Sequence, residues 1–279
     1  MKEKERADTA LVKRGLAPSR EKAQAMIMAG EIYVDERKIN KSSETILEDD
    51  NLIVRESSVK YVSRGAHKLE KAVRVFSADL KDRVIMDVGA STGGFTDICL
   101  RNGARHVYAI DVGYGQLDWK LRNDPRVTVM ERTNARYLTK EMFPDIPEIA
   151  VMDVSFISIR LIIPVLFEIL GEKGTLYTLI KPQFEAGREK IGKNGVVRDS
   201  KTHEEVLNGI IHFAEDKGLH VYRLDFSPIT GPEGNIEFLA EISASRPDTQ
   251  MISTEEVQRI VVDAHSLLLS GRDHNIRPE

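Results

Sequence analysis

The spacing of apolar and polar residues at the start of the chain predicts two short helices followed by strands. Residues 7–14 place apolar side chains at helical intervals, and Gly15 can end that helix. Ser19 can cap a second helix over residues 20–29, and short apolar runs typical of strands follow it. A unit of this size buries little core, so we expect residues 1–55 to form a binding module attached to a larger domain.

A polar linker, residues 56–63, separates this module from an amphipathic stretch at residues 64–76. Apolar residues in the stretch recur at i, i+3, i+4 and i+7, the pattern of a helix with one buried side. Arg64, Lys68 and Lys71 fall on the other side. We therefore expect a helix with basic side chains along one face.

Strand-like and helix-like segments alternate from residue 83 onward, which predicts an α/β fold with a doubly wound, mostly parallel sheet. The last two strands have no helical pattern between them, so we expect an antiparallel pair at one edge. This domain would span residues 64–246, and residues 247–279 would form a C-terminal helix and tail. The predicted strands cover residues 84–88, 106–111, 127–131, 149–153, 175–180, 221–226 and 236–242. The predicted helices cover residues 95–101, 116–122, 159–170, 203–215 and 254–269.

The composition is that of an ordinary globular protein with locally basic segments. The 279 residues include 40 Lys and Arg against 44 Asp and Glu, which gives a net charge of −4. Residues 1–22 nevertheless hold seven basic and four acidic side chains, and residues 60–74 hold five and one. Locally basic surface attracts polyphosphate ligands, although an ordinary solvated surface explains these segments equally well.

Cysteine content and hydropathy exclude several classes of protein. The single cysteine, Cys99, rules out an intramolecular disulfide and a cysteine-cluster zinc site, and it suits a reducing cytosol. The N-terminus has no apolar core of the kind that marks a signal peptide. The most apolar stretch, residues 161–170, is far shorter than the ~20 residues that a bilayer requires. We therefore expect a cytoplasmic protein and exclude a membrane-spanning pore.

A glycine-rich loop follows the first strand of the α/β domain, where glycines allow a sharp turn and a close approach to a ligand. Its spacing is not the Gly-x-Gly-x-x-Gly of dinucleotide sites. S-adenosylmethionine, which has no phosphate, fits the loop better, with a ligand-free turn as the alternative. Asp111 ends the second strand, where an acid can bind ribose hydroxyls. Asn134 follows the third strand and either contacts adenine or only forms a turn. The candidate cofactor residues in the loop are Asp87, Gly89, Ser91, Gly93, Gly94 and Phe95.

Polar residues at several strand ends form a candidate catalytic group. Asp153 and Lys181 follow predicted strands, and Glu237 lies at the start of the antiparallel strand, which places it at the same edge of the sheet. Lys68, on the preceding helix, could lie on the fourth side of the crevice, and Asp153, at the end of the fourth strand, is also a candidate cofactor contact. Taken singly, each is an ordinary solvated residue, but together with the loop they favour an active-site crevice.

The sequence resembles a known family over nearly its whole length. The loop motif Asp-x-Gly-x-x-x-Gly-Gly resembles the first motif of Rossmann-like methyltransferases, and the four polar residues resemble the Lys-Asp-Lys-Glu tetrad of 2′-O-ribose RNA methyltransferases. The order of elements in residues 6–55 and the phrase at residues 16–34 resemble an RNA-binding module known from a small-subunit ribosomal protein. The whole chain resembles the TlyA family of rRNA 2′-O-methyltransferases, also named hemolysins. The phrases that support this are residues 63–69, 111–117 and 131–136.

The resemblance implies a methyl transfer from S-adenosylmethionine to a cytidine ribose in ribosomal RNA. In this scheme Lys181 contacts the hydroxyl as a base or only steers its lone pair, Asp153 and Glu237 orient Lys181, and Lys68 holds the adjacent phosphate or sugar. No metal is required, although Asp87, Asp111 and Asp153 could hold magnesium. The residues expected to contact RNA are Arg6, Arg14, Arg20, Lys22, Arg64 and Lys68.

Two other classes of function stay open at this point. The first is a non-catalytic RNA-binding or ribosome-assembly factor with a methyltransferase-like core, which an intact tetrad argues against. The second is a cytolysin, which the lack of an export signal and of any spanning segment argues against. The expected partners are ribosomal RNA or ribosomal subunits and no membrane, and we expect the protein to be a monomer.

Overall fold

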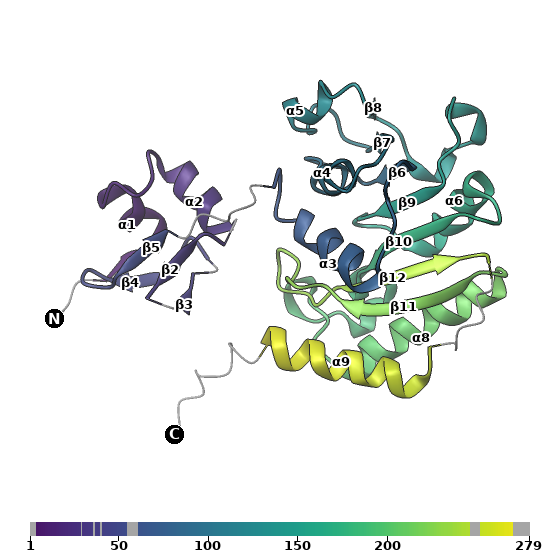
Figure 1. Cartoon of the computed structure of the whole chain (residues 1–279). Coiled ribbons are helices and arrows are strands. Elements are labelled where there is room, and N and C mark those ends of the chain that lie inside the picture. The colour runs from purple at the N-terminus through teal and green to yellow at the C-terminus, as the bar shows by residue number, and fades with distance from the viewer. Residues whose placement is uncertain are drawn as a thin grey trace. The chain divides into compact units, whose positions relative to one another are not determined.

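The computed structural model of the protein describes residues 4–28, 30–35, 37–39, 41–54, 61–245 and 252–269. The chain divides into two compact units, Met1–Arg64 and Gly65–Glu279 (Figure 1). Each unit has its own hydrophobic core. Most of the predicted linker and the predicted C-terminal tail lie outside the described residues.

The first unit contains the predicted helix pair, and Leu11 and Ile27 from these helices are fully buried together with Ile32 and Ile46. The helices are α1 (Ala7–Lys13) and α2 (Arg20–Met28). A three-stranded antiparallel sheet has the order β3-β2-β5, from β2 (Ile32–Val34), β3 (Arg37–Lys38) and β5 (Leu52–Val54). A second antiparallel pair, not predicted from the sequence, joins β1 (Lys4–Arg6) to β4 (Thr45–Leu47).

The second unit is built on a seven-stranded sheet of order β11-β12-β10-β9-β6-β7-β8. Neighbouring strands are parallel except at β12, which runs antiparallel to both β10 and β11. This confirms the predicted Rossmann-like sheet with its antiparallel last strand. The strands are β6 (Val84–Val88), β7 (His106–Ile110), β8 (Val127–Met130), β9 (Ile149–Met152), β10 (Thr175–Ile180), β11 (His220–Phe226) and β12 (Phe238–Ser243).

Helices cover both faces of this sheet, as expected where successive right-handed crossovers run in opposite directions from the centre. Helices α6, α8 and α9 share one apolar core with the sheet, whereas α3 and α4 contact each other and the strands β12, β6 and β7 (Figure 1). The longer helices are α3 (Ala66–Phe76), α4 (Gly94–Arg101), α6 (Ile163–Leu170), α8 (Ser200–Asp216) and α9 (Thr254–Leu269). The one-turn helices are α5 (Trp119–Arg122) and α7 (Pro182–Glu185).

Two predicted helices differ from the observed ones. The helix expected over residues 116–122 begins only at Trp119, after Asp118 caps it. The helix expected over residues 159–170 is split into the 3₁₀ turn η3 (Ile159–Leu161) and α6. Pro164 lies in the first turn of α6 and has no N–H to donate to the preceding turn, so a continuous helix cannot form across this point.

The chain order places a ligand crevice at the centre of the sheet. From β6 the chain moves through β7 to β8 on one side, and then returns to β9 and β10 on the other. The carboxyl ends of β6 and β9 therefore lie at the point where the strand order reverses. Ligands of open α/β sheets bind outside the strand ends at such a point.

Candidate active site

The four strand-end and helix residues singled out in the sequence lie together. Lys68 comes from α3, Asp153 follows β9, Lys181 follows β10 and Glu237 precedes β12. The Lys68 Nζ lies 3.2 Å from Asp153 Oδ2 and 2.7 Å from Glu237 Oε2. The Lys181 Nζ lies 2.5 Å from Asp153 Oδ1. We call these four residues the tetrad; Asp153 links its two lysines.

Burial and pairing fix the charges of two members of the tetrad, Lys68 and Asp153. Lys68 and Lys181 are each 7% exposed and Glu237 is 1% exposed. Burial lowers the pKa of Lys68, but Asp153 and Glu237 outweigh it and hold that pKa above its usual value. Burial raises the pKa of Asp153, but the two lysines outweigh it and hold that pKa below its usual value. Asp153 is therefore a carboxylate and Lys68 an ammonium at neutral pH.

The structure adds three residues that the sequence prediction missed. Ser155 Oγ accepts a hydrogen bond from Lys181 Nζ at 2.8 Å. Phe156 is 92% exposed and has φ = 65°, a left-handed conformation that costs a non-glycine residue about 1–3 kcal/mol. Its ring centroid lies 5.2 Å from that of Phe184. Each phenylalanine follows its tetrad residue by three positions, in Asp-Val-Ser-Phe and Lys-Pro-Gln-Phe, and this repeated spacing is the signal that could have revealed the pair.

The glycine-rich loop makes a tight turn beside the tetrad. Gly89 has φ = 85°, and a Cβ there would lie 2.6 Å from the carbonyl oxygen of Asp153. Gly93 has φ = 97° and begins α4, where a Cβ would collide with Leu121. Neither position accommodates another residue without movement of its neighbours. The turn is therefore packed closely against the segment that follows β9 and against α5.

Two carboxylates at the ends of β6 and β7 are held in different ways. Asp87 is fully buried and accepts a hydrogen bond from Thr96 Oγ1 at 2.6 Å. Burial raises the pKa of Asp87 to about 7, against the lowering effect of that hydrogen bond. Asp111 accepts backbone N–H groups from Ser91 at 2.8 Å and Gly113 at 2.7 Å. Each oxygen of Asp111 keeps a second lone pair, so this carboxylate can still accept hydrogen bonds from a ribose.

The remaining cofactor candidates have structural roles in addition to any ligand contact. Gly94 and Phe95 form the buried first turn of α4, so only their backbone could reach a ligand. Asn134 Oδ1 accepts a hydrogen bond from the backbone N–H of Arg136 at 3.1 Å and caps the 3₁₀ turn η1 (Ala135–Tyr137). This contact supports the turn role of Asn134, and its contact with adenine stays a prediction.

The glycine-rich turn suits S-adenosylmethionine better than a dinucleotide, because its glycines do not have the Gly-x-Gly-x-x-Gly spacing that binds a pyrophosphate. Asp111 offers a ribose acceptor beside the apolar side chain of Val112, which is 70% exposed. Such a set suits a nucleoside with an amino-acid part. Within the described residues, no group of three or more His, Cys, Asp or Glu side chains could hold a metal ion.

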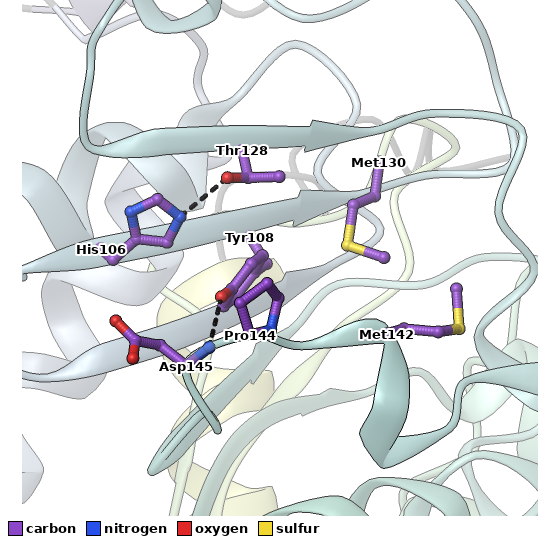
Figure 2. Close-up of a pocket in the computed structure, with 7 residues that line it drawn as sticks. All are labelled: His106, Tyr108, Thr128, Met130, Met142, Pro144 and Asp145. Carbon is purple, nitrogen blue, oxygen red and sulfur yellow. Dashed lines mark hydrogen bonds between the residues drawn. The ribbon is translucent and has the colours of Figure 1, made fainter.

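A separate cavity of about 420 Å³ lies against β7 and β8 (Figure 2). His106 Nε2 and Thr128 Oγ1 are 2.9 Å apart on its wall, and the Tyr108 hydroxyl accepts the backbone N–H of Asp145 at 3.2 Å. Met130, Met142 and Pro144 complete the lining. The cavity shares no residue with the tetrad or the glycine-rich loop.

In the first unit, one buried carboxylate organises two of the predicted RNA contacts. Asp8 is fully buried and accepts hydrogen bonds from Arg6 Nε at 3.0 Å, Arg20 Nε at 3.1 Å and Gln24 Nε2 at 3.0 Å. The hydrogen bond from Arg6 contributes most to holding the pKa of Asp8 well below its usual range. The side chains of Arg6 and Arg20 are 45% and 54% exposed, so Asp8 fixes their position while leaving them accessible.

The other predicted RNA contacts differ in their surroundings. Arg14 donates to the backbone carbonyls of Asp50 at 2.6 Å and Leu47 at 3.1 Å, so its guanidinium stabilises the fold of the first unit. Lys22 is exposed, and Arg64 is partly buried just before α3.

The basic face expected on α3 is turned toward carboxylates. Lys68 lies in the tetrad, and Lys71 Nζ pairs with Asp225 Oδ1 at 2.8 Å. These lysines therefore attach α3 to the tetrad and to β11.

Comparisons with known proteins agree with this geometry. Residues 61–242 match the FtsJ-like methyltransferase family, and residues 5–52 match the S4 domain. The 16S/23S rRNA (cytidine-2′-O)-methyltransferase TlyA of Mycobacterium tuberculosis is 42% identical, over 85% of this chain and 89% of that protein. The chain belongs to the TlyA family of FtsJ-like methyltransferases.

Other relatives of this methyltransferase family match over more of the chain. The Bacillus subtilis protein YqxC, named as a candidate rRNA methyltransferase, is 51% identical over 95% of both chains. A solved structure of a hemolysin-named protein from Streptococcus thermophilus is 46% identical, with a TM-score of 0.74 over 96% of this chain and 98% of that one. Across the parts of this family member that the structure describes, we find no helix with the length and hydropathy needed to cross a bilayer.

Proposed function

We propose that this protein transfers the methyl group of S-adenosylmethionine to the 2′-hydroxyl of a cytidine in ribosomal RNA. The observation that carries the proposal is the buried tetrad directly beside the glycine-rich turn, where Gly89 touches the backbone of Asp153. The name of the Mycobacterium tuberculosis relative supports the choice of cytidine and of the 2′-oxygen.

The cofactor would be held by the turn from Gly89 to Gly93 and by Asp111, with Asn134 near the base. When bound, S-adenosylmethionine supplies an electrophilic methyl group on a sulfonium. The protein must then present a ribose hydroxyl to that group at roughly 3–3.5 Å, and such positioning can contribute ~7–11 kcal/mol. Asp111 keeps acceptor capacity for the ribose of the cofactor after binding two backbone N–H groups.

Lys181 would position the hydroxyl of the substrate. Its ammonium has three N–H donors, of which one faces Asp153 at 2.5 Å and one faces Ser155 at 2.8 Å. The third can donate to the 2′-oxygen and direct a lone pair toward the methyl group. Asp153, held as a carboxylate by both lysines, orients Lys181 and accepts the 2′-proton late in the reaction, directly or through water.

The RNA would be bound by both units. Phe156 presents an exposed ring three residues after Asp153, and exposed aromatic rings stack on unpaired RNA bases. The guanidinium groups of Arg6 and Arg20 would bind phosphates, which fixes the position of the RNA without reading its sequence. We therefore expect RNA shape to select the target. The substrate and the single buried thiol, Cys99, suit a monomer acting in the cytosol.

Mapping of 2′-O-methyl groups in ribosomal RNA with and without the protein tests this function. Ribosomal subunits from a strain that lacks the protein are incubated with radiolabelled S-adenosylmethionine and the purified protein. We expect one or a few cytidines to gain a 2′-O-methyl group, and the Lys181→Ala protein to add none. Binding of subunits without any methyl transfer would overturn the proposal and favour an assembly factor.

A further inference from the structure

Glu185 joins the segment that follows β9 to the segment that follows β10. Its carboxylate side chain is only 1% exposed, although it lies at the end of the one-turn helix α7. It accepts a hydrogen bond from Ser158 Oγ at 2.7 Å and another from the backbone N–H of Ile159 at 2.8 Å. The Nε of Arg160 lies 3.6 Å away and balances its charge.

We propose that Glu185 is a positioning residue for the proposed methyl transfer, and that it holds Ser155 and Phe156 in register with Lys181. It cannot touch the substrate itself, because its carboxylate is enclosed by Ser158, Ile159 and Arg160. Its effect reaches the reaction through the segment to which it binds. The inference rests on the function proposed above.

The segment that carries Ser155 and Phe156 is fixed at both ends. At its start, the backbone N–H of Asp153 donates to the carbonyl of Val88 at 3.0 Å, which ties it to β6. At its other end, Glu185 binds Ser158 and Ile159. Only a few residues lie between these two anchors.

Such an anchor is needed because the conformation between the two ends is unfavourable. Phe156 has a left-handed backbone and an exposed ring, so its own burial does little to keep it in place. A residue in a strained conformation persists only where its surroundings determine that conformation. Without the second anchor, we expect the segment to relax, and Ser155 Oγ to leave the Nζ of Lys181.

The second anchor lies on the same short segment as Lys181. Residues Lys181 to Glu185 include the ring of Phe184, which packs 5.2 Å from that of Phe156. The two segments therefore meet at the hydrogen bond from Lys181 to Ser155, at the aromatic pair and at the buried carboxylate of Glu185. Arg160 extends the contact to α8, where its guanidinium lies 5.6 Å from the centroid of Phe213.

The test compares the full-length protein with the variants Glu185→Ala and Glu185→Gln, and with Glu189→Gln as a matched control on an exposed carboxylate. For each we would measure kcat and KM on unmethylated ribosomal subunits, calorimetric binding of S-adenosylmethionine, and Tm. We expect Glu185→Ala to lower kcat about 10- to 100-fold, because a misplacement of about 1 Å can cost that much. Cofactor affinity should change less than about 3-fold.

The glutamine variant separates positioning from simple support of the fold. Its carbonyl can still accept the N–H of Ile159 and its amide can face Ser158, so we expect most of the lost kcat to return. If Glu185→Ala does not fold, the smaller change Ser158→Ala removes one of the two hydrogen bonds. It should lower kcat several-fold without loss of cofactor binding, and its effect should not add to that of Glu185→Gln.

Several outcomes would overturn the inference. One is a Glu185→Ala protein as active as the wild type. Another is a parallel loss of Tm, cofactor binding and kcat that the glutamine variant does not reverse, which would make Glu185 only structural. If the wild-type protein transfers no methyl group, both the proposed function and this inference are wrong. If the wild type and the Glu185 variants are equally active, only this inference is wrong.

Discussion

Two lysines and two carboxylates share the small volume between α3, β9, β10 and β12. Each charge is acceptable there because an opposite charge lies within 3.2 Å of it. Removal of one member leaves a buried charge without its ion-pair partner, so a mutant can lose activity simply because it does not fold. Lys181 is the member best suited to mutation, since Asp153 keeps its ion pair with Lys68 when Lys181 is replaced.

For Lys181→Ala we expect turnover to fall by at least about 100-fold, because the group that orients the hydroxyl is lost. Affinity for S-adenosylmethionine should stay close to that of the wild type, since the glycine-rich turn and Asp111 are untouched. Radiolabelled methyl transfer and calorimetry measure the two quantities. The exposed Lys190, which pairs with Glu205, provides the control Lys190→Ala. Normal methylation by Lys181→Ala would show that its role is misassigned.

Phe156→Ala should weaken RNA binding without lowering stability. The ring is 92% exposed, so little burial is lost, whereas base stacking on an aromatic ring is worth ~1–3 kcal/mol. This corresponds to a KM for RNA about 5- to 150-fold higher. Steady-state kinetics and thermal unfolding test this pair of effects. An unchanged KM would mean that the ring does not contact the substrate.

Asp87 should make the free energy of unfolding depend on pH. Burial raises its pKa to about 7 in the folded protein, whereas an unfolded aspartate titrates near ~3.9. The folded state therefore binds a proton that the unfolded state does not, and the stability from this group is lost as pH rises from about 4 to 7. The difference between these two pKa values of Asp87 corresponds to about 4 kcal/mol of stability.

The neutral variant Asp87→Asn removes this dependence. It should be more stable relative to the wild type at pH 8 than at pH 5, in urea unfolding without cofactor. Equal differences at both pH values would contradict the raised pKa. Thr96→Val, which removes the hydrogen bond to Asp87 but keeps the carboxyl, should retain the pH dependence.

At the scale of elements, the long strands and helices could be predicted from the sequence because their apolar pattern repeats enough times. Every strand of the large sheet matches its predicted range to within two residues. The pairing of β1 with β4 could not be predicted, since three residues carry too little alternation. The tetrad was predictable because parallel strand ends converge at one edge. Phe156 was missed because neither the exposure of a ring nor backbone strain changes the apolar pattern of the sequence. Ser155 and Glu185 were missed because their contacts join two loops that are distant in the sequence.

The contact between α8 and α9 should weaken in acid. His203 of α8 is fully buried and its Nδ1 lies 2.8 Å from Nε2 of His265 in α9. Burial, and secondly His265, lowers the pKa of His203 to about 4. The unfolded chain takes up this proton near ~6.5, so stability present above that pH is lost as pH falls toward 4, by about 3 kcal/mol.

Urea unfolding at pH 7 and pH 5 in an Asp87→Asn background, which removes the opposite pH dependence of Asp87, would measure this loss, and His203→Gln should reduce it. The protection of the α9 amides against hydrogen exchange should also fall between pH 7 and pH 5. The exposed His212 of α8 gives the control His212→Gln, which should leave the pH dependence as it is. If His203→Gln loses as much stability between the two pH values as the wild type, the buried pair is not the cause.

At the scale of the whole molecule, the chain is slightly acidic, with a net charge of −4, although its proposed substrate is a polyanion. Affinity must then come from a few local cations and must fall as salt rises, because each phosphate contact releases counterions. The exposed guanidinium groups held by Asp8 are the clearest candidates in the first unit.

Arg20→Ala should weaken binding to ribosomal subunits and lower the slope of log affinity against log salt by about 1. Filter binding at several salt concentrations gives this slope. Arg105→Ala removes another exposed arginine that pairs with a carboxylate, Asp145, on the second unit and serves as the control. The same slope for Arg20→Ala and the wild type would exclude a phosphate contact at Arg20.

The close approach of Gly89 to the carbonyl of Asp153 limits how far the methyl donor can lie from the ribose hydroxyl. The glycine-rich turn and the segment that follows β9 approach each other closely there, beside the side chain of Val154. Their separation is set by the pairing of β6 with β9, where Val88 lies opposite Met152. A larger residue at this point would push the two halves of the reaction apart at once, so cofactor affinity and methyl transfer should fail together.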